Sequence, residues 1–314
     1  MTKITSLLVG FSFIFCACTT LPGITQMAGE GIGTYYLITI AEKHTICQAQ
    51  IDSVITALSN TASIFNSNSL VSRINRNETD TLNPILKHLL KVSLQVSEET
   101  GGAFDFTVGA LVNLWGFGKD PQSEVLPEDV ERALQTVGYK KIRVEGNQIM
   151  KENPETQLNF NAIAKGYCVD LVAGFLTSKG VENFIVDIGG ELCVRGKRTP
   201  HTKWRVGIQK PTENREGEIA AEEVMELQNI AVATSGNYRN YIEKDGKRLG
   251  HTINPHTGYP ETNNLLSATV LASTCAFADA YATAFMVLGK EKTETFLSQH
   301  ADIEAYLIDN IINH

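Results

Sequence analysis

The chain has little positive charge and no basic cluster. Its 314 residues include 27 lysines and arginines against 35 aspartates and glutamates, which gives a formal net charge of −8. Proteins that bind nucleic acid usually concentrate basic residues on one face, where they contact phosphates. The composition therefore argues against a nucleic-acid-binding protein.

Several other sequence signals are missing. There is no C-x-x-C pair and no G-x-x-x-x-G-K-[ST] loop, so nothing indicates a zinc site, a thioredoxin-type centre or a P-loop. No linker rich in proline, glycine or serine divides the chain. The predicted helices and strands do not alternate strictly, which disfavours a doubly wound parallel sheet. We therefore predict a single α+β domain.

The N-terminus predicts a bacterial lipoprotein. Lys3 is followed by an almost wholly apolar stretch from Ile4 to Ala17, which is too short to span a bilayer but suits a signal-peptide core. The junction before Cys18 resembles a lipobox, so we expect cleavage there and lipidation of Cys18. Cys16 is the alternative lipidated residue, and secretion without lipid is the other interpretation. Two or more acyl chains would anchor a soluble body to the membrane.

This interpretation divides the chain into three segments. Residues 1–18 are the lipoprotein signal peptide, residues 19–27 a tether, and residues 28–314 the folded domain. The predicted location is the periplasmic side of a bacterial membrane, lipid-anchored, at the inner membrane.

Four cysteines remain in the mature chain. They are Cys47, Cys168, Cys193 and Cys275, and they allow three disulfide pairings in an oxidising compartment. Their apolar sequence surroundings favour buried thiols over disulfides.

Apolar spacing and turn residues predict the main elements. A strand is expected over 34–40, and the spacing of Ile51, Val54, Ile55 and Leu58 predicts a helix after it. Asn83-Pro84 is a typical helix start. The other expected elements are the end of that helix at 101–102, a short helix from 127 to near 138, strands at 183–188, 204–208 and 229–233, and a helix over 275–288.

The run from 100 to 120 has a composition that core packing does not require. It gathers several glycines around the carboxylate of Asp105, which stands between Phe104 and Phe106. Glycine permits sharp turns and close approach of the backbone to a ligand. An acid between two aromatic residues is costly to bury without a partner. We therefore predict that this run belongs to a binding site.

Asp279 and Thr283 are four residues apart in the last predicted helix, so they share one face. Carboxylate, hydroxyl and carbonyl oxygens are the ligands that Mg²⁺ prefers in proteins. The pair could hold such a cation beside a phosphate, although an aspartate and a threonine at this spacing can equally form a solvated surface pair.

Lys165 is predicted in the first turn of a helix, with Gly166 after it. A cation at a helix N-terminus opposes the helix dipole unless an anion binds there, in which case the ammonium and the free N–H groups both contact the anion. The two interpretations are an anion-binding lysine and an ordinary surface lysine.

His251 precedes an Asn-Pro turn and a Thr-Gly turn at the end of a predicted strand. A histidine there could carry a proton or contact a phosphate, although a single loop histidine often does neither. His256 lies inside the turn and is expected to face solvent.

Together these segments resemble the FAD:protein FMN transferase family, also called the ApbE family. They occur in the family's order over most of the chain, and the ordered set is far more specific than any single motif. The matching runs are Gly101–Gly109, Leu111–Gly118, Ala164–Tyr167 with Asp170, Val186–Gly190, Thr234–Gly236, Tyr238–Tyr241, His251–Pro255 with Thr257–Gly258, and Ala278–Ala280 with Thr283.

The resemblance implies a periplasmic, Mg²⁺-dependent enzyme with one α+β, T-fold-like domain of mixed sheets and packed helices. Members split FAD at its pyrophosphate, transfer FMN to a serine or threonine hydroxyl of an acceptor flavoprotein subunit, and release AMP. The residues that the resemblance assigns are Asp279, Thr283 and the Ala162 carbonyl for the metal; Ile32, Phe65, Ala103, Phe104, Asp105, Asn159, Lys165 and His251 for the flavin nucleotide; and His251, Asp279 and Lys165 for catalysis.

Some positions depart from the family's pattern. Ile32 stands where methionine is usual, and Phe65 lies near a position that is often tyrosine. Asn159, Asn237 and Asn254 stand where aspartate is frequent. Phenylalanine keeps a stacking face without the hydroxyl, and amides accept hydrogen bonds without charge. The predicted metal pair is intact.

Two other functions are compatible with the residues. An FAD pyrophosphatase would use water in place of the acceptor hydroxyl and release FMN and AMP. A non-catalytic FAD-binding lipoprotein would not need the metal pair, which argues against it. The sequence also leaves open whether His251 or Asp279 removes the proton of the attacking hydroxyl.

Overall fold

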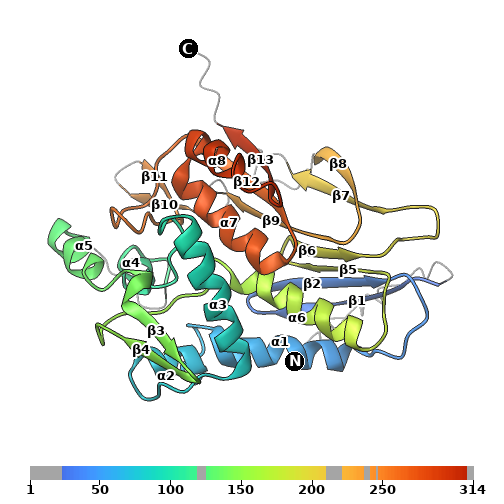
Figure 1. The fold of residues 1–314 in the computed structure, drawn as a ribbon, viewed down its shortest axis with the longest axis horizontal. Coiled ribbons are helices and arrows are strands. Elements are labelled where there is room, and N and C mark those ends of the chain that lie inside the picture. The colour runs from blue at the N-terminus through green and yellow to red at the C-terminus, as the bar shows by residue number, and fades with distance from the viewer. Residues whose placement is uncertain (1–22, 119–124, 210–220, 237–240, 245–246, 310–314) are drawn as a thin grey trace, which may run out of the picture.

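The computed structural model describes residues 23–118, 125–209, 221–236, 241–244 and 247–309. Within these ranges the chain forms a seven-stranded sheet, three two-stranded ribbons, and long helices packed along the sheet (Figure 1). The sheet, in spatial order, consists of β1 (Thr25–Gly31), β2 (Thr34–Ile40), β5 (Phe184–Ile188), β6 (Glu191–Arg195), β9 (Ile230–Gly236), β12 (Leu265–Ala272) and β13 (Glu304–Asp309).

The ribbons pair β3 (Ile142–Glu145) with β4 (Gln148–Lys151), β7 (Trp204–Gln209) with β8 (Ala221–Leu227), and β10 (Tyr241–Lys244) with β11 (Lys247–Gly250). The α-helices are α1 (Gln48–Ala62), α2 (Leu70–Asn75), α3 (Pro84–Glu99), α4 (Gly109–Leu114), α5 (Pro127–Leu134), α6 (Ala164–Ser178), α7 (Cys275–Leu288) and α8 (Lys290–Leu297).

Every pair of neighbouring strands in the described part of the sheet is antiparallel. The predicted α+β class is confirmed. The resemblance implied mixed sheets, whereas the described strands of this sheet are all antiparallel to their neighbours. Two-residue hairpins set the antiparallel direction of two of these strand pairs. Ile32 and Gly33 join β1 to β2, with φ of 46° and 80°, and Gly189 and Gly190 join β5 to β6, with φ of 65° and 100°. Positive φ in a two-residue turn matches the twist of antiparallel strands.

The main helix limits follow from the sequence signals. α1 buries Ile51, Ile55 and Leu58, which have the predicted helical spacing. Asn83 caps α3 by accepting a hydrogen bond from a first-turn N–H at 2.8 Å, and α7 covers residues 275–288 as predicted. The short helix that starts at Pro127 ends at residue 134, before its predicted limit.

Two helices pack directly on the sheet. α6 lies over β5 and β6, and α7 lies over β9 and β12 (Figure 1). The two helices meet near their N-terminal ends, where Gly166 and Asp170 of α6 are hydrogen-bonded to the first turns of α7. α7 buries eleven of its residues, which is expected for a helix that is apolar on most sides. The apolar side chains between these helices, α1, α3 and the sheet form the main core.

The β7–β8 ribbon covers part of the opposite face of the sheet. Side chains alternate between faces along a strand, so Leu192 and Val194 point away from their neighbour Cys193, which belongs to the main core. They form a second cluster with Trp204 of β7 and Leu227 of β8.

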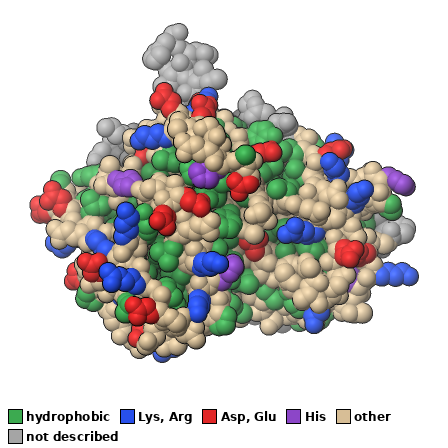
Figure 2. Space-filling view, viewed as in Figure 1, with side chains coloured by type: hydrophobic (Ala, Val, Ile, Leu, Met, Phe, Trp, Pro, Cys, Tyr) green, Lys and Arg blue, Asp and Glu red, His purple; other side chains and the backbone are tan. Residues whose placement is uncertain are grey.

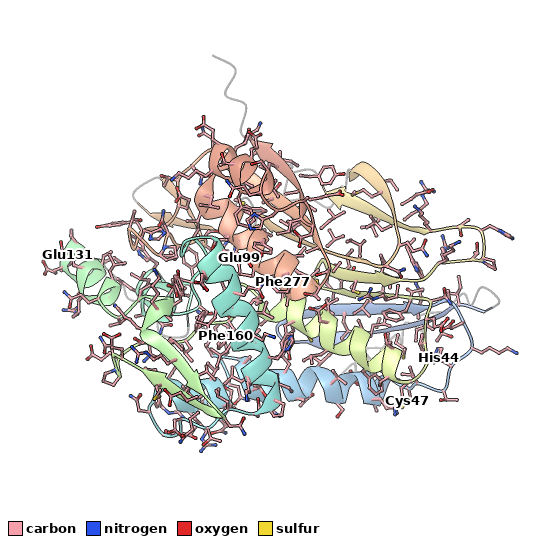
Figure 3. All side chains as sticks on the ribbon, in the orientation of Figure 1. His44, Cys47, Glu99, Glu131, Phe160 and Phe277 are labelled. Atoms are coloured by element: carbon pink, nitrogen blue, oxygen red, sulfur yellow. The ribbon has the colours of Figure 1, made fainter. Side chains whose placement is uncertain are left out.

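α3 is fixed to α7 by a partly buried polar contact. The Tyr281 hydroxyl on α7 donates a hydrogen bond to the carboxylate of Glu99. Glu99 is the last residue of α3 and is labelled in Figure 3. The Tyr281 ring stacks on Phe277 and Phe285, with centroids 6.0 Å apart in each pair. Burial and the Glu99 carboxylate raise the pKa of Tyr281, so the hydroxyl remains a donor. This contact holds the point from which the run 100–120 leaves α3.

The cysteine prediction is correct for three of the four residues. Cys168, Cys193 and Cys275 are buried free thiols. Cys47 is also free but is exposed, because it precedes α1 at the surface and occupies the N-cap position. The prediction of a buried Cys47 is therefore wrong.

Strand β1 begins at Thr25, before the predicted domain boundary at residue 28, and pairs along its length with β2. The signal peptide, Cys18 and the start of the tether lie outside the described residues, as do Asn237 and most of the 238–241 motif. Among the helices of the described ranges, none combines the length and apolar character needed to cross a bilayer. Acidic and basic side chains are interspersed on the face shown in Figure 2.

Candidate active site

A cavity of about 80 Å³ brings together predicted site residues from three distant segments. One wall comes from the run after α3, a second from the loop that follows β11, and a third from α7. The lining residues are Ala103, Phe104, Asp105, Val108, Val112, His251, Thr252, Ile253, Pro255 and Thr283. Half of these were predicted as site residues from the sequence.

The first wall is shaped by two glycines and held by Asp105. Gly101 and Gly102 have φ of 60° and 88°, which turns the chain away from the end of α3. The buried Asp105 carboxylate accepts hydrogen bonds from the Thr107 N–H and hydroxyl at 2.8 and 2.6 Å, and from the Tyr139 N–H at 2.8 Å. Burial nevertheless raises the pKa of Asp105. The protein's own donors therefore account for this buried acid, and a ligand is not required to explain it.

The second wall is fixed by a contact across 143 positions of sequence. The Trp115 indole N–H donates to the Gly258 carbonyl at 2.7 Å. Gly258 has φ of 78°, and a Cβ on it would stand 2.7 Å from Val130. This contact holds the His251 loop against residues 100–118, and the His251 ring meets Phe117 edge-on at 6.4 Å. His256 is exposed, as predicted.

The third wall is the face of α7 that carries Asp279 and Thr283. Asp279 is 2% exposed, and its Oδ2 accepts a hydrogen bond from the Gly166 N–H at 2.9 Å. Thr283, one turn later, shares a hydrogen bond with the Ser235 hydroxyl at 3.2 Å. The Thr-Ser-Gly motif at the end of β9 thus contacts the predicted metal pair.

Lys165 lies between two carboxylates. Its Nζ is 3.1 Å from Glu191 Oε1 and 3.9 Å from Asp279 Oδ1. Burial lowers the pKa of Lys165, but the carboxylates of Asp279 and Glu191 outweigh burial, so the net direction is upward and the ammonium stays charged. The partners of Lys165 are two acidic side chains of the protein itself. The sequence interpretations were a lysine that binds an anion and an ordinary surface lysine, and neither included these acids.

The Ala-Lys-Gly-Tyr motif also has a structural function. A Cβ on Gly166 would stand 2.2 Å from the Cys275 carbonyl oxygen, so only glycine allows α6 to approach α7 at this point. One turn later, the Asp170 carboxylate accepts hydrogen bonds from the Cys275 and Ala276 N–H groups at 2.8 Å each. An acid at a helix N-terminus satisfies unpaired N–H groups and interacts favourably with the helix dipole. Burial raises the pKa of Asp170 to about 6.

The sequence reasoning did not select Glu191. It is the first residue of β6 and is 3% exposed. Burial raises the pKa of Glu191, and the nearby Lys165 ammonium opposes that shift. The one sequence feature that could have indicated Glu191 is its position directly after the Gly189-Gly190 turn.

Besides Asp279 and Lys165, four assigned residues do not line the cavity. Ile32 lies in the β1–β2 turn, where its partly buried side chain packs on the core, and Phe65 is 59% exposed. Asn159 is buried and its N–H donates to the Phe106 carbonyl at 2.8 Å, so it adjoins the first wall. Ala162 is partly buried in the turn before α6.

The donor set around Asp279 fits a hard divalent cation. Two buried carboxylates face one lysine, and Glu191 Oε2 has no hydrogen-bond partner. Buried charge of this kind requires compensation, and carboxylate and hydroxyl oxygens suit Mg²⁺. In the ranges that the structure describes, no three side chains of histidine, cysteine, aspartate or glutamate gather as a metal site. A cation here would therefore need Thr283 and backbone oxygen as well.

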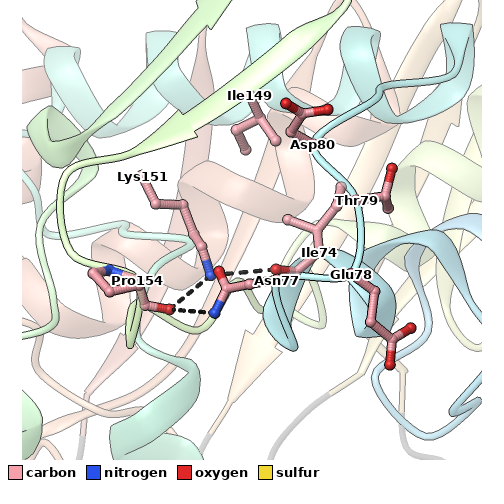
Figure 4. A pocket seen from close by; sticks show the side chains of 8 residues that line it. All are labelled: Ile74, Asn77, Glu78, Thr79, Asp80, Ile149, Lys151 and Pro154. Carbon is pink, nitrogen blue, oxygen red and sulfur yellow. Dashed lines mark hydrogen bonds between the residues drawn. The ribbon is translucent and has the colours of Figure 1, made fainter.

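A larger cavity, of about 400 Å³, lies between α2 and β4 (Figure 4). Its basic residue is Lys151, whose ammonium donates to the carbonyls of Ile74, Pro154 and Thr156 at 3.2, 2.9 and 3.2 Å. An ammonium has three donors. Because backbone carbonyls occupy all three, this lysine joins loops and has no donor left for an anion.

Comparison with known proteins decides the family. Residues 32–307 match the model of the ApbE family. The chain belongs to the ApbE family. It is 38% identical over 280 residues to the FAD:protein FMN transferase of Vibrio cholerae, covering 85% of this chain and 82% of that protein. It is 32% identical over 326 residues to the FAD:protein FMN transferase of Escherichia coli K12, covering 98% and 92%.

Solved structures of ApbE proteins have the same fold. The flavin transferase ApbE from Vibrio cholerae superposes with a TM-score of 0.83 at 33% identity, covering 92% of this chain and 94% of that one. The apo flavinyl transferase ApbE of Pseudomonas stutzeri gives a TM-score of 0.82 at 30% identity, covering 91% of each chain. The family resemblance drawn from the sequence is confirmed.

Proposed function

We propose that this ApbE-family chain is an FAD:protein FMN transferase. It breaks the pyrophosphate of FAD, joins the FMN phosphate to a serine or threonine hydroxyl of an acceptor protein, and releases AMP. The observation that carries the proposal is the cavity formed by Ala103–Asp105, His251 and Thr283, beside the Lys165–Asp279 pair, in a chain whose relatives are FAD:protein FMN transferases.

The proposal includes Mg²⁺ as the cofactor. Asp279, Thr283 and the Ala162 carbonyl would hold it. When bound, the cation would stabilise the negative charge that gathers on the phosphate oxygens during transfer.

The protein's own groups supply charge and positioning. The Lys165 ammonium, held charged by its two acids, lies where it can contact a phosphate at the start of α6. The backbone of the first wall, which is the run that follows α3, would lie next to the nucleotide. The cavity is smaller than the roughly 300–1,000 Å³ of typical small-molecule sites, so it would hold only part of FAD.

The base that accepts the proton of the attacking hydroxyl is best assigned as His251. Asp279 is almost fully buried, with one oxygen bonded to the Gly166 N–H and the other facing Lys165. His251 lines the cavity and is only partly buried. A base must lie within hydrogen-bond reach of the proton that it removes, and His251 meets that condition better than the buried acid.

The partner and the location complete the proposal. The acceptor is a flavoprotein subunit with an exposed serine or threonine motif. The enzyme is tethered through lipid on Cys18 to the periplasmic side of a bacterial membrane. The face shown in Figure 2 carries interspersed acidic and basic side chains, and the formal net charge of the chain is −8, so neither supports a nucleic-acid partner.

The test is incubation of residues 19–314 with FAD, Mg²⁺ and a peptide that contains the acceptor threonine, followed by intact-mass measurement. Transfer predicts a mass gain of FMN minus water on the peptide and equal release of AMP. AMP and free FMN without labelled peptide would indicate a pyrophosphatase instead. FAD bound without cleavage would indicate a carrier.

A further inference from the structure

The position of Glu191 is set by the turn that precedes it. The Asp187 carboxylate accepts a hydrogen bond from the Gly190 N–H at 3.0 Å. Gly189 lies against the β2 strand, because a Cβ on it would stand 2.8 Å from the Thr34 hydroxyl. Glu191 therefore starts β6 from a fixed turn and is buried next to the start of α6.

The contacts of Glu191 are unequal. One oxygen, Oε1, is 3.1 Å from the Lys165 ammonium, whereas Oε2 is buried with no hydrogen-bond partner. The same ammonium is 3.9 Å from Asp279, beyond a close ion pair. Lys165 is therefore held nearer to Glu191 on β6 than to Asp279 on α7.

This geometry matters to a cation at Asp279. A lysine that paired closely with Asp279 would neutralise the carboxylate and compete with the metal for the same oxygen. A lysine held on Glu191 leaves Oδ1 of Asp279 without a close ammonium contact, while the charge of the lysine still faces an incoming phosphate. Mutation of residues that orient the ligands of a metal commonly changes metal affinity by 10- to 100-fold.

We propose that Glu191 is a positioning residue that holds Lys165 away from Asp279 and so keeps the Asp279 carboxylate available to a divalent cation. The proposal rests on the proposed function for the identity of the cation, Mg²⁺. It concerns a residue that neither the motifs nor the assigned metal set includes.

The test measures Mg²⁺ binding to the full chain in detergent, without FAD, by calorimetry and by the rise in melting temperature with MgCl₂. Glu191→Gln keeps the shape of the side chain and removes its charge. We expect it to need roughly tenfold or more Mg²⁺ for half-saturation. Glu182→Gln removes the same charge from an exposed position that precedes β5, at the open end of the β5–β6 hairpin, and should bind Mg²⁺ like the wild type.

A double-variant cycle separates positioning from direct ligation. In a Lys165→Met background there is no ammonium to hold, so adding Glu191→Gln should change Mg²⁺ affinity by less than about threefold if the residue acts through the lysine. An equal tenfold loss in both backgrounds would mean that Glu191 binds the cation itself, and it would overturn the proposal. Unchanged affinity of Glu191→Gln in the wild-type background would overturn it too.

The double variant also guards against misfolding. Replacing both members of a buried ion pair is commonly tolerated better than removing one. If Glu191→Gln alone does not fold, a roughly tenfold loss of Mg²⁺ affinity between Lys165→Met and the double variant would still overturn the proposal.

Failure of this inference is distinguishable from failure of the proposed function. Wild-type protein that transfers FMN while Glu191→Gln binds Mg²⁺ normally would refute only the positioning role. Wild-type protein that binds Mg²⁺ in a Glu191-dependent manner but transfers no FMN would refute only the transferase.

Discussion

Gly166 lies so close to Cys275 that a Cβ on the glycine would stand 2.2 Å from the Cys275 carbonyl oxygen. The same glycine donates its N–H to Asp279 at 2.9 Å. The approach of α6 to α7 and the placement of the predicted metal carboxylate therefore depend on one residue that lacks a side chain.

Gly166→Ala should consequently separate the two helices. We expect a loss of about 1–3 kcal/mol in the free energy of unfolding, as is typical of overpacking, together with weaker Mg²⁺ binding. Urea unfolding measures the first effect.

Gly174, in the same helix, has open space where a Cβ would stand, with no heavy atom within 4 Å. Gly174→Ala should instead stabilise the protein by about 0.5–1 kcal/mol, because alanine has the higher helix propensity. Equal effects at the two positions would contradict this account.

Asp279→Asn tests the carboxylate with little change in shape. The amide oxygen can still accept the hydrogen bond from the Gly166 N–H, so the far-ultraviolet circular dichroism spectrum should be unchanged. Loss of the charge should reduce Mg²⁺-dependent release of AMP from FAD by about a hundredfold or more, which is the scale of removing one group that stabilises developing charge. Asp302→Asn, at an exposed position, is the control. Retained turnover with a normal spectrum would remove Asp279 from the metal site.

His251→Ala should slow FMN transfer by about 10²- to 10⁴-fold, the usual contribution of a general base. FAD binding, followed by flavin fluorescence, should change much less than the rate. The control is His201→Ala, which alters an exposed histidine away from the cavity. An unchanged single-turnover rate in His251→Ala would show that another group accepts the proton.

Thiol labelling should single out Cys47. Burial raises the pKa of Cys168 to about 12 and that of Cys193 to about 11, and it raises the pKa of Cys275 as well. These thiols therefore stay protonated and shielded at pH 8, because only the thiolate is nucleophilic. In native protein of residues 19–314, a disulfide reagent should react rapidly at Cys47 alone, and at the other three only after unfolding. Rapid reaction of native Cys47→Ser protein would contradict the burial of the other three thiols.

The lipid anchor is tested by metabolic labelling with a fatty acid in a bacterial host. Cys18→Ser should abolish incorporation and release the protein from the membrane fraction, whereas Cys16→Ser should leave both unchanged. The reverse result would assign the lipid to Cys16. Labelling of neither wild type nor variants would indicate secretion without lipid.

The fold was predictable where one local signal determined the structure. Asn83-Pro84 starts α3, and the apolar stretch before Gly289 forms α7, because capping and burial act over a few neighbouring residues. The direction of the strands in the sheet was not predictable, since it depends on which strands meet across long connections. The exposure of Cys47 was missed because apolar neighbours in sequence do not fix which side of a helix start faces solvent.

The site was predictable as a set of motifs but not as a network of contacts. Asp279, Thr283 and His251 were found from spacing and family resemblance, and the structure places Thr283 and His251 on one cavity. The acids around Lys165 could not be inferred, because Glu191 reaches it from a strand 26 positions later in the chain. Asp105 was interpreted as a ligand contact, yet its partners are donors of the protein itself, and sequence does not reveal which donors fold onto an acid.

The start of β1 at Thr25 would keep the folded body close to a lipid attached at Cys18. Only seven positions separate Cys18 from Thr25, and an extended chain spans at most about 3.3–3.6 Å per residue, or roughly 25 Å in all. With lipid on Cys18, the folded body would stay within that distance of the headgroups. Its search for an acceptor would then be two-dimensional, confined to proteins that display their threonine or serine within a thin layer above the same membrane.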